Sequence, residues 1–380
     1  MKMVSLQSLV SKVSQSAGEN KYPVLSITAG VGFVNQAEKF GKEIAGAQYA
    51  HYTVLKKGDF SYNKGNSNTY PQGCIYRQDD YEYAAVPNVF NSFRFISPNC
   101  DTTYYKHLFE SGYLNRQLSQ MINSGVRNDG LLNIYEDDFY SCNVPCPPFE
   151  EQKRIAEILE CCDKVIRLKR ELIEEKKKQK KSLMQRLMRL WTSNYRNESL
   201  GQNITLVSGV DFTPSYYNEI NDGTPYITGA SNIEGKSIVI NRWTRFPRNI
   251  AVQNDIILVC KGAGVGTIAK MNYPKAHIAR QLMAIRGGDK MKTDYIYYFL
   301  EDSIHEIKKK SKGLIEGIDR KAILELKINV PPIPYQEKTI RILSSVDHEL
   351  DLLEQDLSLW ELKKKSLMQL LLTGAISTIK

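Results

Sequence analysis

The chain has 380 residues, of which 42% are hydrophobic, so it is long enough for two or three globular domains with buried cores. Its net charge of +9 and its pI near 9.0 favour a polyanionic partner, while seven cysteines without a Cys-x-x-Cys pair argue against a disulfide framework and a zinc site. No apolar run reaches the roughly 18 residues that a membrane span needs, and the first residues lack a signal-peptide core, which predicts a cytoplasmic protein.

Residues 1–146 have the pattern of a first mixed α/β domain. Strands rich in β-branched and aromatic residues are predicted at Tyr22–Thr28, at Tyr52–Leu55 and within Tyr81–Ile96. The second of these strands ends in a turn at Lys57-Gly58-Asp59. Asp101 is typical of a helix N-cap and predicts a helix to about Ile122, and short strands are expected between Leu131 and Val144.

A long helix is predicted at 147–195, and its sequence is repeated 184 residues later. Pro147-Pro148-x-x-x-Gln152 recurs as Pro331-Pro332-x-x-x-Gln336, and 14 of the 42 residue pairs from 147/331 to 188/372 are identical. This period is too long for a solenoid repeat, so each repeated unit must be a domain followed by a helix. A two-fold chain in turn suggests a two-fold partner or target.

Residues 196–330 repeat the plan of the first domain with different letters. A strand at Pro225–Thr228, strands within Ile250–Leu258 around Asn254-Asp255, and a helix at Asp294–Lys310 are its predicted elements. The helices are therefore better preserved between the two copies than the globules. This difference indicates that the helices share one task while the globules have two different ones.

The second long helix, at 331–380, carries an apolar coiled-coil seam. Its seam positions are Leu350, Leu353, Leu357, Trp360, Leu367 and Leu371. The first helix is weaker, because the lysine-rich run 176–181 interrupts its seam. A dimerisation coil is one interpretation, but two copies in one chain most simply pack antiparallel. The predicted fold class is α+β, with two mixed α/β domains joined by two long helices that form an antiparallel coiled coil, a pseudo-two-fold internal repeat.

Catalytic motifs are weak. The glycine-rich stretch 261–267 follows a strand but precedes another strand rather than a helix, so a hairpin turn or a nucleic-acid-facing loop is favoured over a nucleotide site. Cys146-Pro147-Pro148-Phe149 resembles the adenine-holding tetrapeptide of amino-methyltransferases, but Cys replaces the Asn or Asp that it needs. Asp319, Glu325 and Lys327 have the spacing of a nuclease metal site, which is common by chance. The prediction is a non-catalytic chain without a bound metal.

Basic and aromatic residues alternate in both globules, as in proteins that hold phosphates with Lys and Tyr and read base edges with Arg and Gln. The candidate DNA-binding residues are Lys57, Tyr62, Lys64, Tyr76 and Arg77 in the first globule, and Tyr216, Arg242, Arg245, Lys261, Gly262, Gly264, Arg280 and Gln281 in the second. Many of the tyrosines could equally be core residues.

Two variable globules, each followed by a helix that begins Pro-Pro-x-x-x-Gln and contains Lys-Ser-Leu-Met-Gln, resemble the specificity subunit of type I restriction–modification enzymes. The resemblance implies that 1–146 and 196–330 are target recognition domains that each read half of a split, asymmetric DNA site, and that the helices 147–195 and 331–380 are spacers that bind two modification subunits. The implied partner-binding positions are Gln152, Ile158, Leu159, Leu183, Met184, Gln336, Ile342, Leu343, Leu367 and Met368.

The same resemblance implies that this chain binds no cofactor of its own. S-adenosylmethionine would belong to the modification subunits, and ATP and Mg to two motor–nuclease restriction subunits. The alternative is a coiled-coil nucleic-acid-binding adaptor with no role in restriction–modification, although such an adaptor does not need two large globules with paired basic loops.

Overall fold

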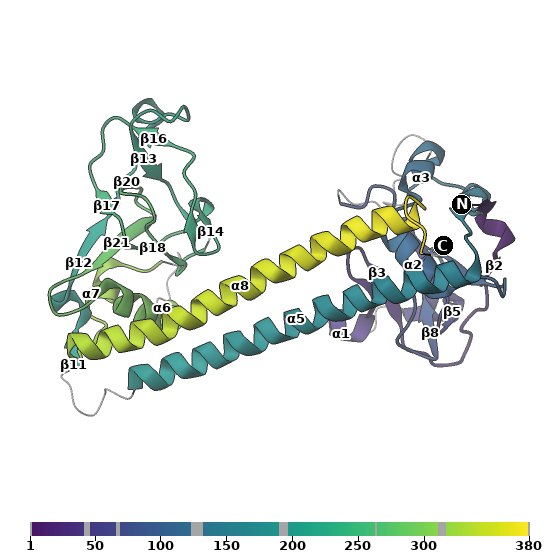
Figure 1. The fold of residues 1–380 in the computed structure, drawn as a ribbon, viewed down its shortest axis with the longest axis horizontal. Helices are drawn as coiled ribbons and strands as arrows, with labels where there is room; N and C mark the ends of the chain where they lie inside the picture. Colours follow the sequence, from purple (N-terminus) through teal and green to yellow (C-terminus); the bar gives the residue numbers. More distant parts are fainter. Residues whose placement is uncertain are drawn as a thin grey trace. The chain divides into compact units, whose positions relative to one another are not determined.

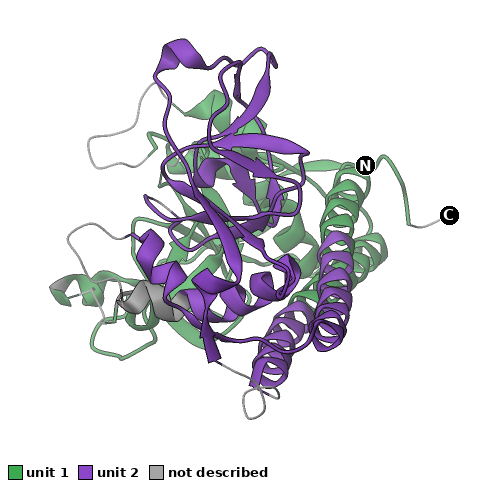
Figure 2. Cartoon of the chain, turned by 90° about the vertical axis from the view of Figure 1, so that its left-hand side faces the viewer, with its two compact units in different colours: residues 1–170, 356–380 green, residues 171–355 purple. Residues whose placement is uncertain are grey.

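A computed structural model describes residues 2–41, 46–65, 69–122, 132–189, 197–262, 264–310 and 317–378. Two compact units divide the chain: unit 1 comprises residues 1–170 and 356–380, and unit 2 comprises residues 171–355 (Figure 2). The boundary between the units falls within the two long helices, so each unit contains one globule and a part of each helix (Figure 1). No helix in the described ranges is long and apolar enough to cross a membrane.

Unit 1 is built on a four-stranded antiparallel sheet in the order β2-β9-β6-β7. These strands are β2 (Val10–Lys12), β9 (Asn91–Phe95), β6 (Phe60–Asn63) and β7 (Cys74–Arg77). Three antiparallel pairs are also present in the described part of the unit: β3 (Leu25–Thr28) with β4 (Gly32–Asn35), β5 (Thr53–Lys56) with β8 (Tyr83–Val86), and β1 (Met3–Ser5) with β10 (Asn143–Pro145). The three strand regions predicted in the first globule are thus confirmed as β3, β5 and β8–β9.

The helices of unit 1 correct two predictions. Asp101 is the expected N-cap, since its Oδ1 accepts hydrogen bonds from two backbone amides of the following turn. The helix that it begins is α2 (Thr102–Glu110), and a separate α3 (Asn115–Met121) follows, because Gly112 at φ +74° turns the chain between them. Between Leu131, which is outside the described residues, and Val144, the chain forms α4 (Glu136–Ser141) before β10, so the prediction of strands alone is wrong there.

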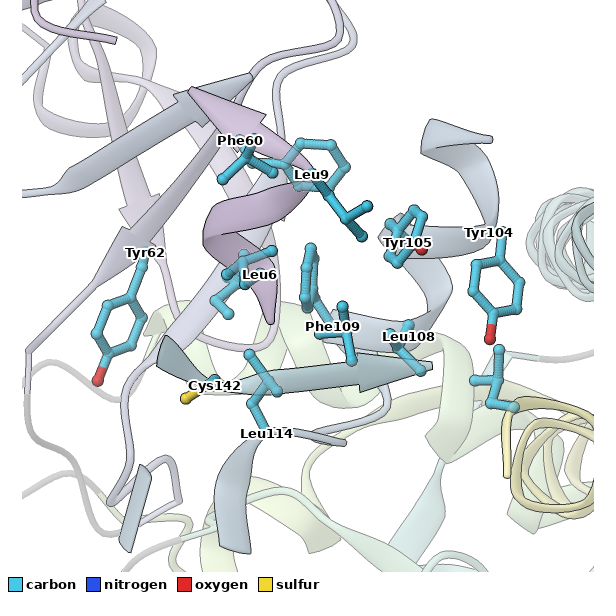
Figure 3. Close-up of a cluster of buried hydrophobic side chains, with 14 of the residues drawn as sticks. Leu6, Leu9, Phe60, Tyr62, Tyr104, Tyr105, Leu108, Phe109, Leu114 and Cys142 are labelled. Carbon is cyan, nitrogen blue, oxygen red and sulfur yellow. The ribbon is translucent and has the colours of Figure 1, made fainter. Parts of the chain in front are cut away.

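Short helical elements connect the strands of unit 1. They are η1 (Leu6–Ser8), α1 (Gln36–Phe40) and η2 (Gly46–His51). Aromatic side chains fill its core (Figure 3). Phe60 stacks on Phe93 with ring centroids 5.4 Å apart, and Tyr62 stacks on Phe139 at 4.7 Å. Leu159 from the first long helix belongs to the same cluster, so the helix closes the core of the globule.

Unit 2 repeats this architecture. Its four-stranded antiparallel sheet has the equivalent order β12-β21-β18-β19, made of β12 (Ile204–Ser208), β21 (Leu282–Gly287), β18 (Ile256–Val259) and β19 (Ile268–Lys270). A second sheet has the order β16-β13-β20-β17, made of β16 (Trp243–Thr244), β13 (Thr224–Ile227), β20 (Lys275–Ile278) and β17 (Ile250–Val252). Strands β13 and β20 are parallel, and the counterpart in unit 1 is the parallel bridge between Val24 and Ala85.

Some of the remaining elements of unit 2 also have counterparts in unit 1. The remaining elements are β11 (Asn197–Ser199) paired with β22 (Lys327–Asn329), β14 (Ile233–Glu234) paired with β15 (Ser237–Ile238), α6 (Thr293–Lys310), α7 (Arg320–Leu324), η3 (Leu200–Gln202), η4 (Pro214–Tyr216) and η5 (Ala230–Asn232). The pair β11–β22 is the equivalent of β1–β10, and α6 is the equivalent of α2. The internal duplication inferred from the helices therefore extends to the globules.

One buried carboxylate–arginine pair recurs in both globules. Asp59 accepts from Nε and Nη2 of Arg94, both at 2.6 Å, and Asp255 accepts from Nε and Nη2 of Arg286 at 2.6 and 2.8 Å. Both aspartates are 1% exposed, and each also accepts a hydrogen bond from the backbone amide three residues earlier. A carboxylate held by a bidentate arginine and a backbone N–H is well compensated for its burial. The pair fixes the turn that leads into β6 and into β18.

The two long helices are α5 (Phe149–Arg189) and α8 (Ile333–Leu372). Within unit 1, Lys364 of α8 forms an ion pair with Asp163 of α5, and within unit 2, Lys176 of α5 lies 2.6 Å from Glu349 of α8. The paired numbers rise along α5 as they fall along α8, so the helices pack antiparallel as predicted.

Lysines of the run 176–181 contact α8 through charge instead of an apolar seam. Lys177 lies 2.9 Å from Glu354 and is half-exposed. Lys180 is only 8% exposed at its side chain, and its Nζ lies 2.7 Å from Glu301 of α6 and 2.9 Å from Asp347 of α8. The interruption of the seam is therefore a set of ion pairs between α5 and its neighbours.

The repeated glutamines attach each long helix to its globule. Gln152, which is fully buried, accepts a hydrogen bond from the amide of Asp101 at 2.9 Å and donates to the carbonyls of Asn99 and Pro147. Gln336 repeats all three bonds, with Lys292 as donor and the carbonyls of Lys290 and Pro331 as acceptors. A buried primary amide with three hydrogen bonds is nearly satisfied, which explains why the same residue type serves both copies.

A polar junction beside each helix pair differs between the copies. In unit 2, Tyr298 donates to Asp347 at 2.9 Å. Burial raises the pKa of Asp347, but its bonds to Lys236 and Lys180 lower this pKa by more than burial raises it, so the net shift is downward. In unit 1 the position of Tyr298 is taken by His107, whose Nδ1 is 3.8 Å from Asp163. Neither ring nitrogen of His107 has a hydrogen-bond partner among the described residues. Burial, together with Lys364, lowers the pKa of His107 to about 4.

Candidate nucleic-acid interface

Three loops meet at one end of the unit 2 globule: residues 228–232 after β13, the hairpin between β18 and β19, and the turn 279–281 between β20 and β21. The backbone amide of Cys260 donates to the carbonyl of Gln281 at 2.8 Å, and that of Ala279 donates to Ile227 at 2.9 Å. A methyl group added to Gly229 would lie 2.4 Å from Oε1 of Gln281. The absence of a side chain at Gly229 is what allows the Gln281 amide to rest against this loop.

Five of the residues predicted to bind DNA lie together at this end. They are Lys261, Gly262 and Gly264 in the hairpin, and Arg280 and Gln281 in the turn. Lys261 is exposed and makes no ion pair within the described part of the chain. The two glycines have φ of +80° and +82°, so the hairpin uses a backbone conformation that other residues rarely adopt. The glycine-rich stretch is the hairpin turn that the sequence favoured over a nucleotide-binding loop.

A fourth segment, residues 209–211, borders the same turn. The amides of Gly209 and Val210 donate to the carbonyls of Leu282 and Ile278, at 3.0 and 2.9 Å. Asp211 then accepts a hydrogen bond from the backbone amide of Arg280 at 2.9 Å, and its second oxygen lies 2.7 Å from Nε of the same residue. Asp211 was not a predicted site residue, because its partner is 69 positions away in the sequence.

The equivalent end of unit 1 has the same three loops with other side chains. Gly30, in the turn between β3 and β4, donates its amide to the hydroxyl of Tyr76 at 2.9 Å, which ties this turn to β7. Lys64 begins the β6–β7 connection, of which 66–68 are outside the described residues. The turn 87–90 carries Val89, which is 45% exposed. Lys64 and Tyr76 thus lie at or next to the loops predicted to face DNA.

The three other predicted residues of unit 1 either make contacts within the protein or lie away from these loops. Tyr62 is fully buried in the core, where its hydroxyl donates to the carbonyl of Gln72 and burial raises its pKa. Arg77 donates to Asp79 and to the hydroxyls of Thr102 and Thr103 at the start of α2. Lys57 is exposed, but it lies in the β5–β6 turn, at the opposite end of β6 from Lys64. These contacts account for Tyr62 and Arg77 without DNA.

Tyr216, Arg242 and Arg245 form a separate group around β16. Tyr216 packs edge-on against Phe246, with ring centroids 5.5 Å apart. Arg242 lies 4.9 Å above the ring of Tyr217 and 3.3 Å from Glu219, and Arg245 pairs with Asp222. Both arginines are therefore already next to a carboxylate, which lowers their net attraction for phosphate.

The predicted partner-binding residues mostly face their own globules. Gln152, Leu159, Met184, Gln336 and Leu343 are buried, and Leu183, Leu367 and Met368 pack against the same cores. Ile158 is 37% exposed and Ile342 is half-buried. The surface of the helices instead presents Leu168 and Leu352, 48% and 51% exposed, which are separated by the repeat length of 184 residues. Both are leucines at equivalent positions of the repeat, and this signal in the sequence could have identified them as candidate partner-binding residues.

The described residues hold no set of three or more His, Cys, Asp or Glu side chains that could bind a metal ion. Asp319 accepts a hydrogen bond from the amide of Ala322 as the N-cap of α7, and Lys327 donates to Ser199. Glu325 pairs with Lys321 along the helix. The nuclease-like spacing of these three residues therefore corresponds to three separate structural contacts.

Comparison with known proteins extends over most of the chain. Residues 10–178 and 210–359 match the family model described as the type I restriction modification DNA specificity domain. A relative from Methanocaldococcus jannaschii, named as the MjaX specificity subunit of a type I restriction enzyme, is 26% identical over 266 residues. This match covers 64% of the chain and 61% of the relative's length.

Solved structures share the fold. A chain from a study of the complex assembly and conformational transition of the type I R-M system has a TM-score of 0.66 at 19% identity, covering 98% of this chain and 97% of that one. The S subunit of a type I restriction–modification system from M. genitalium has a TM-score of 0.59 at 18% identity, covering 98% and 96%. These similarities include both globules and both long helices.

Proposed function

The chain belongs to the family of type I restriction–modification DNA specificity subunits, and from this premise we propose that it reads a bipartite, asymmetric DNA site, one half with the loop end of each unit. The main observation that supports this proposal is that the same three loops recur in both units with different side chains. The turn with Arg280 and Gln281 in unit 2 corresponds to Asn88 and Val89 in unit 1, because the strands that follow these turns, β21 and β9, pair with β18 and β6 in the same register.

Different side chains at equivalent turns support different half-sites. Arg pairs with guanine and Gln with adenine through two hydrogen bonds, whereas an exposed valine suits the methyl group of thymine. Lys261 and Lys64, one on each hairpin, supply charge for phosphates, which positions the duplex without specifying sequence. Each half-site should therefore have its own sequence, read by its own unit.

The long helices are proposed to carry the partners. Leu168 on α5 and Leu352 on α8 are exposed at equivalent positions of the repeat, which supports one copy of the same partner on each helix. These partners would be two modification subunits, which supply S-adenosylmethionine and methyl transfer, and two restriction subunits, which supply ATP and Mg chemistry. The present chain would be the non-catalytic member that chooses the sequence.

The helices are also proposed to set the distance between the half-sites. Four residues inserted after Arg170 and four after Gln355, at the boundary between the units, would lengthen both helices while preserving the antiparallel pairs within each unit. The insertion adds about 6 Å of helix at about 1.5 Å per residue, slightly under two base pairs at about 3.4 Å each. The methylated motif should keep both halves and gain one or two base pairs of spacer. Full methylation at the original spacing would exclude a measuring role.

The direct test is exchange of one globule. The full chain, expressed with modification subunits, should direct methylation of a split motif, and the chain alone should transfer no methyl group. Replacing residues 1–146 with the equivalent region of a relative should change one half of the motif in methylome sequencing and leave the other half intact. Change in both halves would contradict separate reading, and no methylation in any combination would favour the alternative of a nucleic-acid-binding adaptor.

A further inference from the structure

Arg280 lies at the tip of the β20–β21 turn, paired with one carboxylate, that of Asp211. Asp211 contacts it twice, by accepting from the backbone amide at 2.9 Å and by placing its other oxygen 2.7 Å from Nε. The Arg280 side chain is 72% exposed, and neither Nη atom is hydrogen-bonded to a residue that the structure describes. The outer edge of the guanidinium, with its two Nη groups, is therefore available while Nε faces Asp211.

Gly209 makes this arrangement possible. A methyl group added to Gly209 would lie 2.0 Å from the carbonyl oxygen of Ala279, so only glycine lets the segment approach the turn. The neighbouring Val210 is tied down twice, because its amide donates to Ile278 and its carbonyl lies 2.8 Å from Nε2 of His277. Asp211 thus projects from a fixed backbone toward a fixed turn.

Stability does not explain the Asp211–Arg280 pair. Ion pairs between exposed side chains contribute little to stability, because water screens them and the side chains lose freedom. Orientation does explain it, because an arginine that is already held loses less side-chain entropy when it binds a planar partner. A phosphate can be reached by a mobile side chain, whereas a base edge demands a defined direction.

From this geometry, and resting on the proposed function, we infer that Arg280 reads a guanine in the half-site of unit 2 and that Asp211 is the residue that positions it. The two Nη groups match the O6 and N7 acceptors of guanine in the major groove, which is the commonest specific contact of arginine. Asp211 acts through Arg280 and need not touch DNA. Unit 1 has Asn88 at the equivalent position, so the guanine belongs to one half-site only.

The test uses the full chain with its modification subunits. Methylome sequencing first gives the wild-type motif, and exchange of residues 1–146 identifies the half read by unit 2. Dissociation constants are then measured for the duplex carrying that motif and for duplexes with single base pairs of this half replaced. Arg280→Ala should lower discrimination at one G·C pair by about 5- to 150-fold and leave the other positions unchanged. Arg280→Lys, which keeps the charge but not the fork, should lose the same discrimination and keep the salt dependence.

Asp211→Asn should weaken discrimination at that same base pair while the salt dependence stays constant, because Arg280 keeps its charge. Asp294→Asn is the matched control, since Asp294 is also 44% exposed and paired, with Lys270 at 2.7 Å, on α6 away from the loops. It should leave the motif unchanged. The half-site of unit 1 reports in every variant that the chain is folded.

Two results would overturn the inference while leaving the proposed function intact. One is equal weakening of all sequences by Arg280→Ala with a smaller salt slope and rescue by Arg280→Lys, which identifies a phosphate contact. The other is an unchanged motif in Asp211→Asn. Absence of any sequence-specific methylation by the wild-type complex would instead overturn the proposed function, and the inference with it.

Discussion

Replacement of Lys180 by methionine should destabilise unit 2 strongly. Methionine fills a similar volume but removes the charge that Glu301 and Asp347 share at 2.7 and 2.9 Å. Loss of one partner from a buried ion pair costs about 3–5 kcal/mol, because the other charge stays buried without compensation. Asp347 keeps Lys236 and Tyr298 as partners, and the two carboxylates are 30% and 15% exposed and keep some hydration, so no more than the lower end, about 3 kcal/mol, is expected.

Lys177→Met is the matched control in the same helix. Lys177 and Glu354 are 48% and 50% exposed at their side chains, so this pair should contribute less than about 1 kcal/mol. Helix propensity changes equally in both variants, because the substitution is the same and both positions are inside α5. The difference between the variants therefore isolates the effect of burial.

Differential scanning calorimetry of the full chain measures the effect. About 3 kcal/mol corresponds to a fall in the melting temperature of roughly 6–12 °C for the transition that contains unit 2, a unit of about this size losing 2–4 °C per kcal/mol. The Lys177 variant should shift this transition by at most a few degrees. Equal shifts in the two variants, or a shift below about 2 °C for Lys180→Met, would refute the assignment of a buried, stabilising lysine.

Three further outcomes are expected. His107 has a folded-state pKa of about 4, below its ordinary value near 6.5, so the unfolded chain takes up the proton first as pH falls. The free energy of unfolding of unit 1 should therefore fall by up to about 3 kcal/mol between pH 6.5 and pH 4. In urea titrations His107→Phe should remove this part of the pH dependence, and a pH profile identical to that of the wild type would contradict the prediction. Gln152→Leu in unit 1 and Gln336→Leu in unit 2 should each cost about 3 kcal/mol, because three backbone groups lose their hydrogen-bond partner. A cost below about 1 kcal/mol in denaturant unfolding would contradict the role of these glutamines in attaching each long helix to its globule. Gly209→Ala should cost about 1–3 kcal/mol of stability, because the added methyl group overlaps the Ala279 carbonyl, and should lower base discrimination in the half-site of unit 2. A wild-type melting temperature and an unchanged motif would contradict the close approach of Gly209 to this carbonyl.

The sequence predicted the elements whose signals are local. The Pro-Pro pairs mark the starts of both long helices, which begin at Phe149 and Ile333. The identical letters at a spacing of 184 residues revealed the duplication. Local signals were also present where a prediction was wrong, since three consecutive acidic residues at 136–138 are typical of a helix start.

The contacts that the sequence could not supply join residues far apart in the chain. Asp211 and Arg280 are 69 positions apart, and Asp59 and Arg94 are 35 apart. Tyr62 is of a residue type that often contacts DNA. Whether a tyrosine in a strand faces the core depends on the pairing register of that strand, and here the register places the Tyr62 side chain against Phe139. Patterns of residue type indicate a nucleic-acid surface but not which members of the pattern reach it.

The discontinuity of unit 1 has a consequence for biosynthesis. Its core includes Leu371 and Leu372 of α8, which leave the ribosome long after residues 1–170. At about 5–20 residues per second, synthesis of the intervening 185 residues takes roughly 10–40 s. During this interval all residues of unit 2 become available, while the first globule keeps an apolar surface open to water. The nascent chain should therefore bind chaperones through its first-made globule, and a late frameshift should damage the half of the protein that was translated first.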